Sequence, residues 1–161
     1  LIFTQTRIGQ NGKKFKIYKF RSMYMDAEER KAKLLSQNEL ETTLMFKMDN
    51  DPRVFPFGQK LRDWSLDELP QFINVLKGDM ALVGPRPILL FEAKEYGERL
   101  PYLLICKPGI TGYWTTHGRS KVLFPQRADL ELYYLQCHST KNDIKLLALT
   151  IWQTIKGLDA Y

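Results

Sequence analysis

SLDELPQ, residues 65–71, places two carboxylates, Asp67 and Glu68, side by side at the expected start of a helix. Ser65 stands at the spacing of a capping box from Glu68, and in that case both acids would only stabilise the helix terminus. Pro70 argues against a plain helix start, because it removes a backbone hydrogen bond and crowds the preceding turn. The segment therefore predicts a delayed or strained helix start, in which the acids have either a capping or a functional role.

Basic residues flank the two acids on both sides. Arg62 precedes them in KLRDWS, and Arg86 follows them in the tetrapeptide GPRP at residues 84–87. The prolines around Arg86 restrict the backbone, so this arginine would lose little entropy on binding a phosphate. Acids among fixed cations are a common arrangement for binding phosphates and a metal ion. By itself, GPRP is equally compatible with a plain surface loop.

The composition indicates a folded chain that favours anionic partners. Its 161 residues suit one domain with a core, and 44% hydrophobic residues with 26% charged residues exclude a disordered chain. The net charge of +6 favours phosphates, nucleic acid or an anionic membrane surface. Cys106 and Cys137 are isolated and, with two histidines, give no metal-ligand spacing. No apolar run in residues 1–161 reaches the ~20 residues needed to cross a bilayer, and the first residues do not have the pattern of a signal peptide.

The first part of the chain predicts a β-hairpin. Residues 2–8 alternate apolar and polar side chains, and the Asn-Gly pair at 11–12 favours a type I′ turn before a second strand over 14–23. Lys19 and Arg21 lie near the end of that strand. Two interpretations stay open for them: the lysine-protected edge of a solvated strand, or a pair of phosphate ligands.

The rest of the chain predicts a mostly helical α+β fold, a single domain over residues 1–161. His117 alone is more typical of a structural or exposed histidine than of a catalyst. The last predicted helix has a broad apolar face with Trp152 and nearby lysines, so it is either a core helix or a helix at a membrane interface. We expect helices over 26–46, 57–64, 66–77, 88–99, 126–137 and 143–156, a short strand over 80–83, and an aromatic, glycine-rich loop over 109–120.

Four motifs follow one another along the chain: TQTRIGQNGKKFKIYKFRSM (4–23), DNDPRVFPFGQKLRDWSLDELPQFINVLKGDMALVGPRP (49–87), KPGITGYW (107–114) and DIKLLALTIW (143–152). Together they resemble the bacterial sugar transferases. These are the monotopic phosphoglycosyl transferases that act on polyprenyl phosphate. The resemblance covers nearly the whole chain.

The resemblance implies an enzyme that moves a sugar-1-phosphate from a nucleotide diphosphate sugar, usually UDP-linked, to undecaprenyl phosphate, at the start of capsule, exopolysaccharide or glycan assembly. It implies that Asp67 is the nucleophile of a covalent phosphosugar intermediate and binds Mg²⁺. A helix N-terminus at Asp67 would favour its ionised form. Glu68 would either orient the metal or help the acceptor phosphate attack. The implied phosphate- and nucleotide-binding cations are Lys19, Arg21, Arg62, Arg86 and Arg119.

The resemblance also implies contact with membrane lipid through amphipathic helices, at the cytoplasmic face of the bacterial inner membrane. It is compatible with a homo-oligomer. The family's hydrophobic N-terminal helix would lie just before Leu1, so we expect a catalytic domain that lacks this helix. Where many relatives read WQVSGR, this chain reads WTTHGRS at 114–120, which changes the loop that would contact the sugar or nucleotide and keeps Arg119.

The alternative function is a basic nucleic-acid-binding module without catalysis. KKFKIYKFR, residues 13–21, mixes basic and aromatic side chains as single-stranded nucleic-acid binders do. This alternative leaves the acids between the arginines unexplained. It predicts salt-sensitive binding of RNA or DNA, whereas the transferase predicts no nucleic-acid partner.

Overall fold

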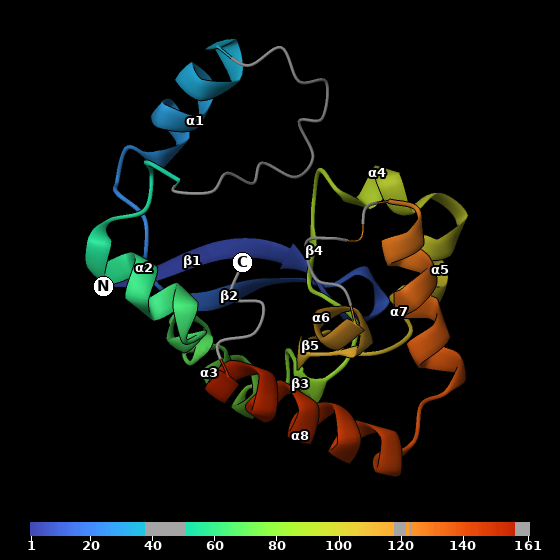
Figure 1. Ribbon diagram of the computed structural model, residues 1–161. Helices are drawn as coiled ribbons and strands as arrows, with labels where there is room; N and C mark the ends of the chain where they lie inside the picture. Colours follow the sequence, from blue (N-terminus) through green and yellow to red (C-terminus); the bar gives the residue numbers. More distant parts are fainter. Residues whose placement is uncertain (38–50, 118–121, 123, 157–161) are drawn as a thin grey trace.

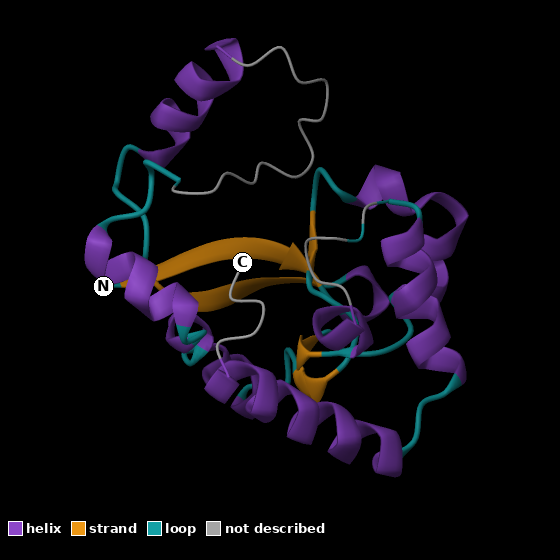
Figure 2. Ribbon diagram, viewed as in Figure 1, coloured by secondary structure: helices purple, strands orange, loops and turns teal. Residues whose placement is uncertain are grey.

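The computed structural model describes residues 1–37, 51–117, 122 and 124–156. Two small sheets lie in the middle of the molecule and helices lie around them (Figures 1 and 2). One sheet has the strand order β2-β1-β4, and the other consists of β3 and β5. The described residues thus confirm the predicted α+β class.

The N-terminal hairpin forms as predicted. β1 (Ile2–Ile8) pairs antiparallel with β2 (Lys14–Phe20). In the connecting turn, which includes the 3₁₀ segment η1 (Gln10–Gly12), Asn11 and Gly12 have φ angles of 56° and 75°. A type I′ turn requires such positive angles at both central residues. β2 ends earlier than predicted because the chain leaves the sheet, and Met23 forms a bridge with Val54 instead.

The second sheet holds the GPRP segment through close backbone contact. β3 (Ala81–Val83), which confirms the predicted strand, runs parallel to β5 (Gly109–Thr111). A Cβ atom on Gly109 would lie 2.1 Å from the backbone nitrogen of Gly84, and one on Gly112 would lie 2.2 Å from the carbonyl oxygen of Gly84. Only glycine permits this approach, so the backbone of GPRP is placed directly against residues 109–112.

The single helix predicted over 88–99 is wrong. Ile88 and Leu89 instead form β4 (Ile88–Leu89), which pairs with the free edge of β1 and buries Ile88. The helical part begins only at α4 (Ala93–Tyr96) and ends where Gly97 adopts a φ of 51°. A 3₁₀ turn, η3 (Gly97–Arg99), and α5 (Leu100–Leu103) follow. The sequence shows that residues 88 and 89 are apolar, but it does not show that the edge of β1 is available for pairing with them.

The other predicted helices are present with small shifts. α2 (Pro56–Asp63), α7 (Gln126–Gln136) and α8 (Thr140–Lys156) confirm three of them. α1 (Ala27–Gln37) confirms the start of the helix predicted over 26–46, and the remainder of that prediction lies outside the described residues. The predicted loop over 109–120 contains β5 and a short helix, α6 (Tyr113–His117). Two apolar clusters form the core, one of Ile88, Tyr96, Leu103 and Ala128 and one of Val83, Tyr134 and Leu146.

The helix predicted over 66–77 starts late, as Pro70 indicated. The two acids lie in a 3₁₀ turn, η2 (Leu66–Glu68), and α3 (Gln71–Leu76) begins after Pro70. The capping interpretation of Ser65 is wrong. Ser65 has a left-handed backbone (φ 53°, ψ 21°) and makes no side-chain cap hydrogen bond, because it forms the sharp connection between α2 and η2 rather than the extended backbone of an N-cap.

α3 is polar on its inner side and apolar on its outer side. Gln71 and Asn74 are 2% and 0% exposed. The apolar side chains of this helix and of Leu69 just before it point outward, with exposures between 45% and 87% for Leu69, Phe72, Ile73 and Leu76. Such a helix packs on the protein through hydrogen bonds and leaves its apolar surface available.

We expect Gly109→Ala to destabilise the fold by about 3 kcal/mol, because its methyl group would meet backbone atoms of Val83 and Gly84 that cannot move independently. Thermal or urea unfolding measures this. Gly9→Ala is the matched control, since there the nearest atoms belong to the Phe15 ring at 3.1 Å, and a side chain can shift. Equal stability of Gly109→Ala and the unsubstituted protein would contradict the close packing of GPRP.

Candidate active site

Asn74 holds the acidic pair beside the hairpin. Its side-chain Oδ1 accepts a hydrogen bond from the backbone N–H of Tyr18 (3.0 Å), and its Nδ2 donates to the carbonyl oxygen of Lys16 (2.7 Å). These bonds satisfy the open edge of β2 and dock α3 on it. The turn η2, just before α3, consequently lies next to the end of β2, where the Nζ of Lys19 approaches Glu68 Oε1 to 2.6 Å.

The two adjacent acids have different surroundings, as expected for neighbouring residues in a helical turn. Asp67 is only 3% exposed, whereas the side chain of Glu68 is 32% exposed and forms the ion pair with Lys19. The Oδ1 of Asp67 is buried and accepts no hydrogen bond from the described residues. A buried carboxylate oxygen without a donor is costly. It is therefore a position where a bound cation or a reacting phosphorus atom would be favourable.

Burial raises the pKa of Asp67, and the adjacent charge of Glu68 adds to this rise, while Lys19 and Arg62 act against it. We expected a helix N-terminus to favour the ionised form of Asp67, but burial has the larger effect on its pKa. η2 has only three residues, and its dipole is correspondingly short. Lys19 and Arg62 are the cations that favour the ionised carboxylate of Asp67.

The residues at the dyad fit a magnesium ion. Mg²⁺ commonly binds through one or two carboxylates together with substrate phosphates and water. Asp67 offers a buried unpartnered oxygen, and Glu68 is the second carboxylate beside it. Among the described residues there is no cluster of three or more Asp, Glu, His or Cys side chains suited to a metal. A fully protein-built metal cage is therefore not the arrangement found in this part of the chain.

The structure brings some of the predicted cations to the dyad and not others. Lys19 contacts Glu68, and Arg62 lies close enough to Asp67 to lower its pKa. Arg21 lies over the ring of Phe3, 5.9 Å from its centre, on the side of β1. Arg86 pairs with Glu92 and lies over the ring of Trp114. Arg119 lies outside the described residues.

Arg7 connects the dyad with GPRP, and the sequence analysis missed it. This arginine of β1 is 7% exposed; its Nη1 donates to the carbonyl oxygen of Pro87 (3.1 Å) and its Nη2 to Gln5 Oε1 (2.8 Å). Burial, and then Arg86, lower its pKa to about 10, while Glu92 and Glu68 act in the opposite direction. Arg7 therefore lies within electrostatic reach of both halves of the site.

A buried ion pair, Arg127 with Glu131, lies near Arg86. Arg127 and Glu131 of α7 are 0% and 1% exposed, with Nε and Oε1 3.7 Å apart. Arg127 also donates to the Tyr96 hydroxyl (3.1 Å) and lies 4.5 Å from the centre of the Trp114 ring. Trp114 thus contacts both Arg86 and Arg127. The sequence does not reveal this pair, because an Arg and a Glu four residues apart on a helix normally form a solvated surface pair.

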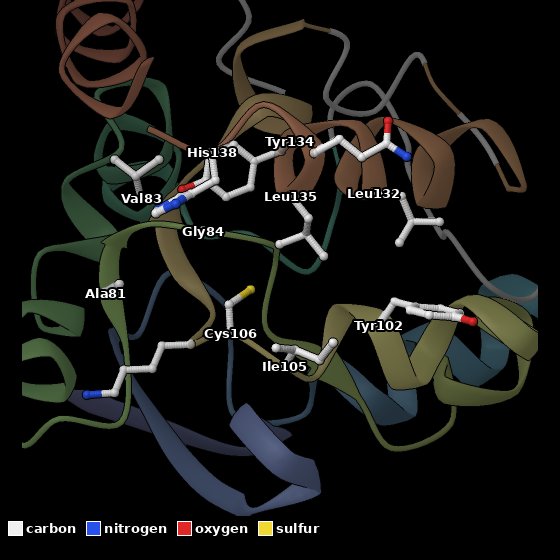
Figure 3. A pocket seen from close by; sticks show the side chains of 12 residues that line it. Ala81, Val83, Gly84, Tyr102, Ile105, Cys106, Leu132, Tyr134, Leu135 and His138 are labelled. Carbon is white, nitrogen blue, oxygen red and sulfur yellow. The ribbon is translucent and has the colours of Figure 1, made fainter. Parts of the chain in front are cut away.

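A cavity of about 710 Å³ lies away from the dyad, between β3, α5 and α7. Figure 3 shows Cys106, Ile105 and Tyr134 pointing into this mostly apolar space. Neither of the acids nor any of the candidate cations lines it. The volume of this cavity therefore does not identify the site of the charged chemistry, which lies on the dyad side.

The sequence profile described as "Bacterial sugar transferase" matches residues 1–157. The chain belongs to the bacterial sugar transferase family. This confirms the resemblance that the four motifs showed. It also means that the dyad, the hairpin and GPRP described above are parts of a sugar transferase domain.

Three curated relatives illustrate the similarity of this chain to known members of the family. The galactosyl transferase CpsE of Streptococcus agalactiae is 46% identical over 99% of this chain. The undecaprenyl-phosphate galactose phosphotransferase of Salmonella typhimurium is 42% identical over 99% of it. The exopolysaccharide production protein ExoY of Rhizobium meliloti is 36% identical over 94% of it, and the match covers 68% of ExoY. The chain spans about a third of the length of the first two, 35% and 34%.

The buried Glu131 should make the stability of the fold depend on pH. Burial raises the pKa of Glu131 from 4.5 to about 7, although Arg127 and Arg86 oppose the shift. The folded state then holds a proton that the unfolded state has released. Stability is therefore lost as the pH rises from 4.5 to about 7, by roughly 3 kcal/mol from this group.

Glu131→Gln removes this titration. We expect urea unfolding between pH 4.5 and 8 to show a difference between wild type and variant that changes over this range and is constant above it. Glu95→Gln, an exposed glutamate of α4, is the control and should leave the wild-type slope unchanged. Parallel pH profiles for wild type and Glu131→Gln would show that Glu131 titrates normally.

Proposed function

We propose that this chain transfers a sugar-1-phosphate from a UDP-sugar to undecaprenyl phosphate through a covalent intermediate on Asp67. The buried, unpartnered Oδ1 of Asp67 beside the Lys19–Glu68 pair is the observation that carries the proposal. The names of the relatives support the substrates: one is an undecaprenyl-phosphate galactose phosphotransferase, and another is a UDP-glucose:undecaprenyl-phosphate glucose-1-phosphate transferase of Escherichia coli.

In the first half-reaction, an Oδ atom of Asp67 attacks the phosphorus that bears the sugar. A new oxygen–phosphorus bond forms at Asp67, and the bond from that phosphorus to the bridging oxygen of the diphosphate breaks. UMP leaves with the bonding electrons and the negative charge. Lys19 and Arg62, the cations nearest Asp67, are suited to stabilising the charge on the phosphoryl oxygens.

In the second half-reaction, a phosphate oxygen of the lipid acceptor attacks the same phosphorus, and the bond to Asp67 breaks. The polyprenyl diphosphate sugar forms, and Asp67 regains its carboxylate. Glu68 is partly exposed and held by Lys19, so its carboxylate is available to accept the acceptor's proton or to share in cation binding. Mg²⁺, held by Asp67 with Glu68 nearby, would neutralise diphosphate charge.

The two roles of the acids are separable by experiment. Asp67→Asn keeps the shape of the side chain but removes the attacking charge, so UMP release from UDP-galactose or UDP-glucose without acceptor should fall by at least about 1,000-fold. Glu68→Gln keeps the nucleophile and should retain a slow first half-reaction. Intact mass of wild-type protein with UDP-sugar and Mg²⁺ should show the addition of one sugar phosphate, located on the peptide that contains Asp67.

Circular dichroism and thermal unfolding of both variants control for loss of fold. If wild type gives no adduct under any trapping condition, and product forms only when both substrates are bound together, direct transfer is the mechanism. Asp67 would then act as a metal ligand or base. Salt-sensitive RNA or DNA binding without sugar-phosphate transfer would favour the nucleic-acid alternative instead.

We further propose that α2, α3 and α8 face the lipid of the inner membrane from its cytoplasmic side, where UDP-sugars occur. In the described residues no helix is long or apolar enough to cross a bilayer. α2, α3 and α8 follow one another along one side of the molecule (Figure 1). Outward-pointing apolar side chains over this row are Phe57, Trp64, Leu66, Leu69, Phe72, Ile73, Leu76, Ile144, Ile151, Trp152 and Ile155, all at least 42% exposed.

Exposed lysines on α8 support this orientation. Lys145 and Lys156 lie on the same helix as the exposed Trp152 and Ile151, an arrangement suited to an anionic lipid surface. Leu146 and Gln153 face the protein instead. One face of α8 thus belongs to the core, and the other is apolar and exposed, which supports the proposed contact with lipid.

We expect the protein to float with vesicles that contain phosphatidylglycerol. Ile151→Glu should weaken this binding roughly 10-fold, because it places a charge where an apolar side chain would enter the lipid. Ile105→Glu is the matched control, since Ile105 is 64% exposed but lines the cavity between β3, α5 and α7 and belongs to none of α2, α3 and α8. Protein that stays in the aqueous fraction whatever the lipid charge would show that this row is not a membrane-binding surface.

A further inference from the structure

Arg86 has little freedom left in its backbone and is held at its side chain as well. It stands between Pro85 and Pro87, whose rings restrict the main chain. Its Nη2 lies 3.9 Å from Oε1 of Glu92, and its guanidinium carbon lies 5.3 Å from the centre of the Trp114 ring. The side chain of Arg86 is 30% exposed, so this cation reaches the surface from a constrained position.

Glu92 is an unusual partner for an exposed cation, because its own side chain is only 3% exposed. Its second oxygen, Oε2, accepts a hydrogen bond from the backbone N–H of Leu89 (3.2 Å). Leu89 belongs to β4 and is the register partner of Arg7 in β1. The carboxylate is thereby fixed to the sheet that also carries Arg7, and its other oxygen is the one on the side of Arg86.

The charges of this cluster do not balance within it. Among the described residues, three arginines, Arg7, Arg86 and Arg127, share two buried carboxylates, Glu92 and Glu131. Even with both carboxylates ionised, one positive charge is left over, and Arg86 is the arginine that is partly exposed. A guanidinium that is anchored from behind and open in front is suited to binding two oxygens of a phosphate.

We propose that Glu92 is a positioning residue that orients Arg86 toward the diphosphate of the nucleotide sugar. The proposal rests on the proposed function, in which the candidate cations bind this diphosphate. Glu92 itself does not contact the substrate. A buried ion pair is seldom the most stable choice for a protein interior, and an apolar side chain at position 92 would fill the space at lower desolvation cost. Orienting Arg86 would be the function that explains a buried carboxylate at position 92.

The test is a double-mutant cycle on the full-length protein in membranes, with UDP as the binding probe and UDP-galactose and UDP-glucose for turnover. Glu92→Gln keeps an oxygen that accepts the Leu89 bond and removes only the charge. We expect it to weaken UDP binding about 10-fold and to raise KM more than it lowers kcat. In the Arg86→Ala background, Glu92→Gln should have no further effect on UDP binding. Glu95→Gln, an exposed glutamate of α4 three residues after Glu92, is the matched control and should change neither quantity.

The outcomes separate this inference from the function on which it rests. Equal losses from Glu92→Gln with and without Arg86 would show that Glu92 acts only on the fold, and unchanged UDP binding by Glu92→Gln would show that it does not orient Arg86. Either result overturns the inference. If Arg86→Ala itself binds UDP and turns over UDP-sugar normally, the phosphate-binding role of Arg86 in the proposed function fails as well. Urea unfolding of each variant verifies that the compared proteins are folded.

Discussion

The side-chain amide of Asn74 replaces the missing neighbour of β2, and the arrangement of the acidic residues depends on it. A strand edge carries backbone donors and acceptors that need partners, and one amide group satisfies a donor and an acceptor of β2 at once. Because this contact is directional, it sets both the position and the angle of α3. An apolar contact of similar area would allow the helix to slide, and Glu68 would lose its fixed distance to Lys19.

Arg7 has a comparable role for the other half of the molecule. The hairpin with η2 forms one half of the charged region, and GPRP with α4 and α7 forms the other. Arg7 lies in β1 between them and bonds to the last carbonyl of GPRP. Its buried charge is stabilised by Glu68 on one side and by Glu92 on the other. The two halves are therefore linked by long-range electrostatics as well as by the pairing of β1 with β4.

Short sequence patterns predicted the elements that are determined by interactions between residues close together in the chain. The Asn-Gly turn, the delayed helix after Pro70 and the acidic pair were all readable because backbone preference acts within a few residues. β4 was not readable, since a two-residue strand exists only where another strand offers an edge. The buried charges were not readable either. Arg7 and its partner Pro87 are 80 residues apart, and Arg127 with Glu131 has the spacing of an ordinary surface pair. Of the candidate site, the sequence thus predicted the acids and cations that are proposed to bind substrate better than the residues that hold them in place.

The outward apolar side of α3 has a consequence for measurements on this protein in water. Exposed apolar side chains favour association in water, and another copy of the same chain offers a matching apolar surface. The size of particles measured in detergent-free buffer would then depend on protein concentration and ionic strength, and it would not identify a native assembly. If α3 lies on lipid as proposed, the number of subunits is better measured in nanodiscs or native membranes, where Phe72, Ile73 and Leu76 would contact lipid instead of a neighbouring protein.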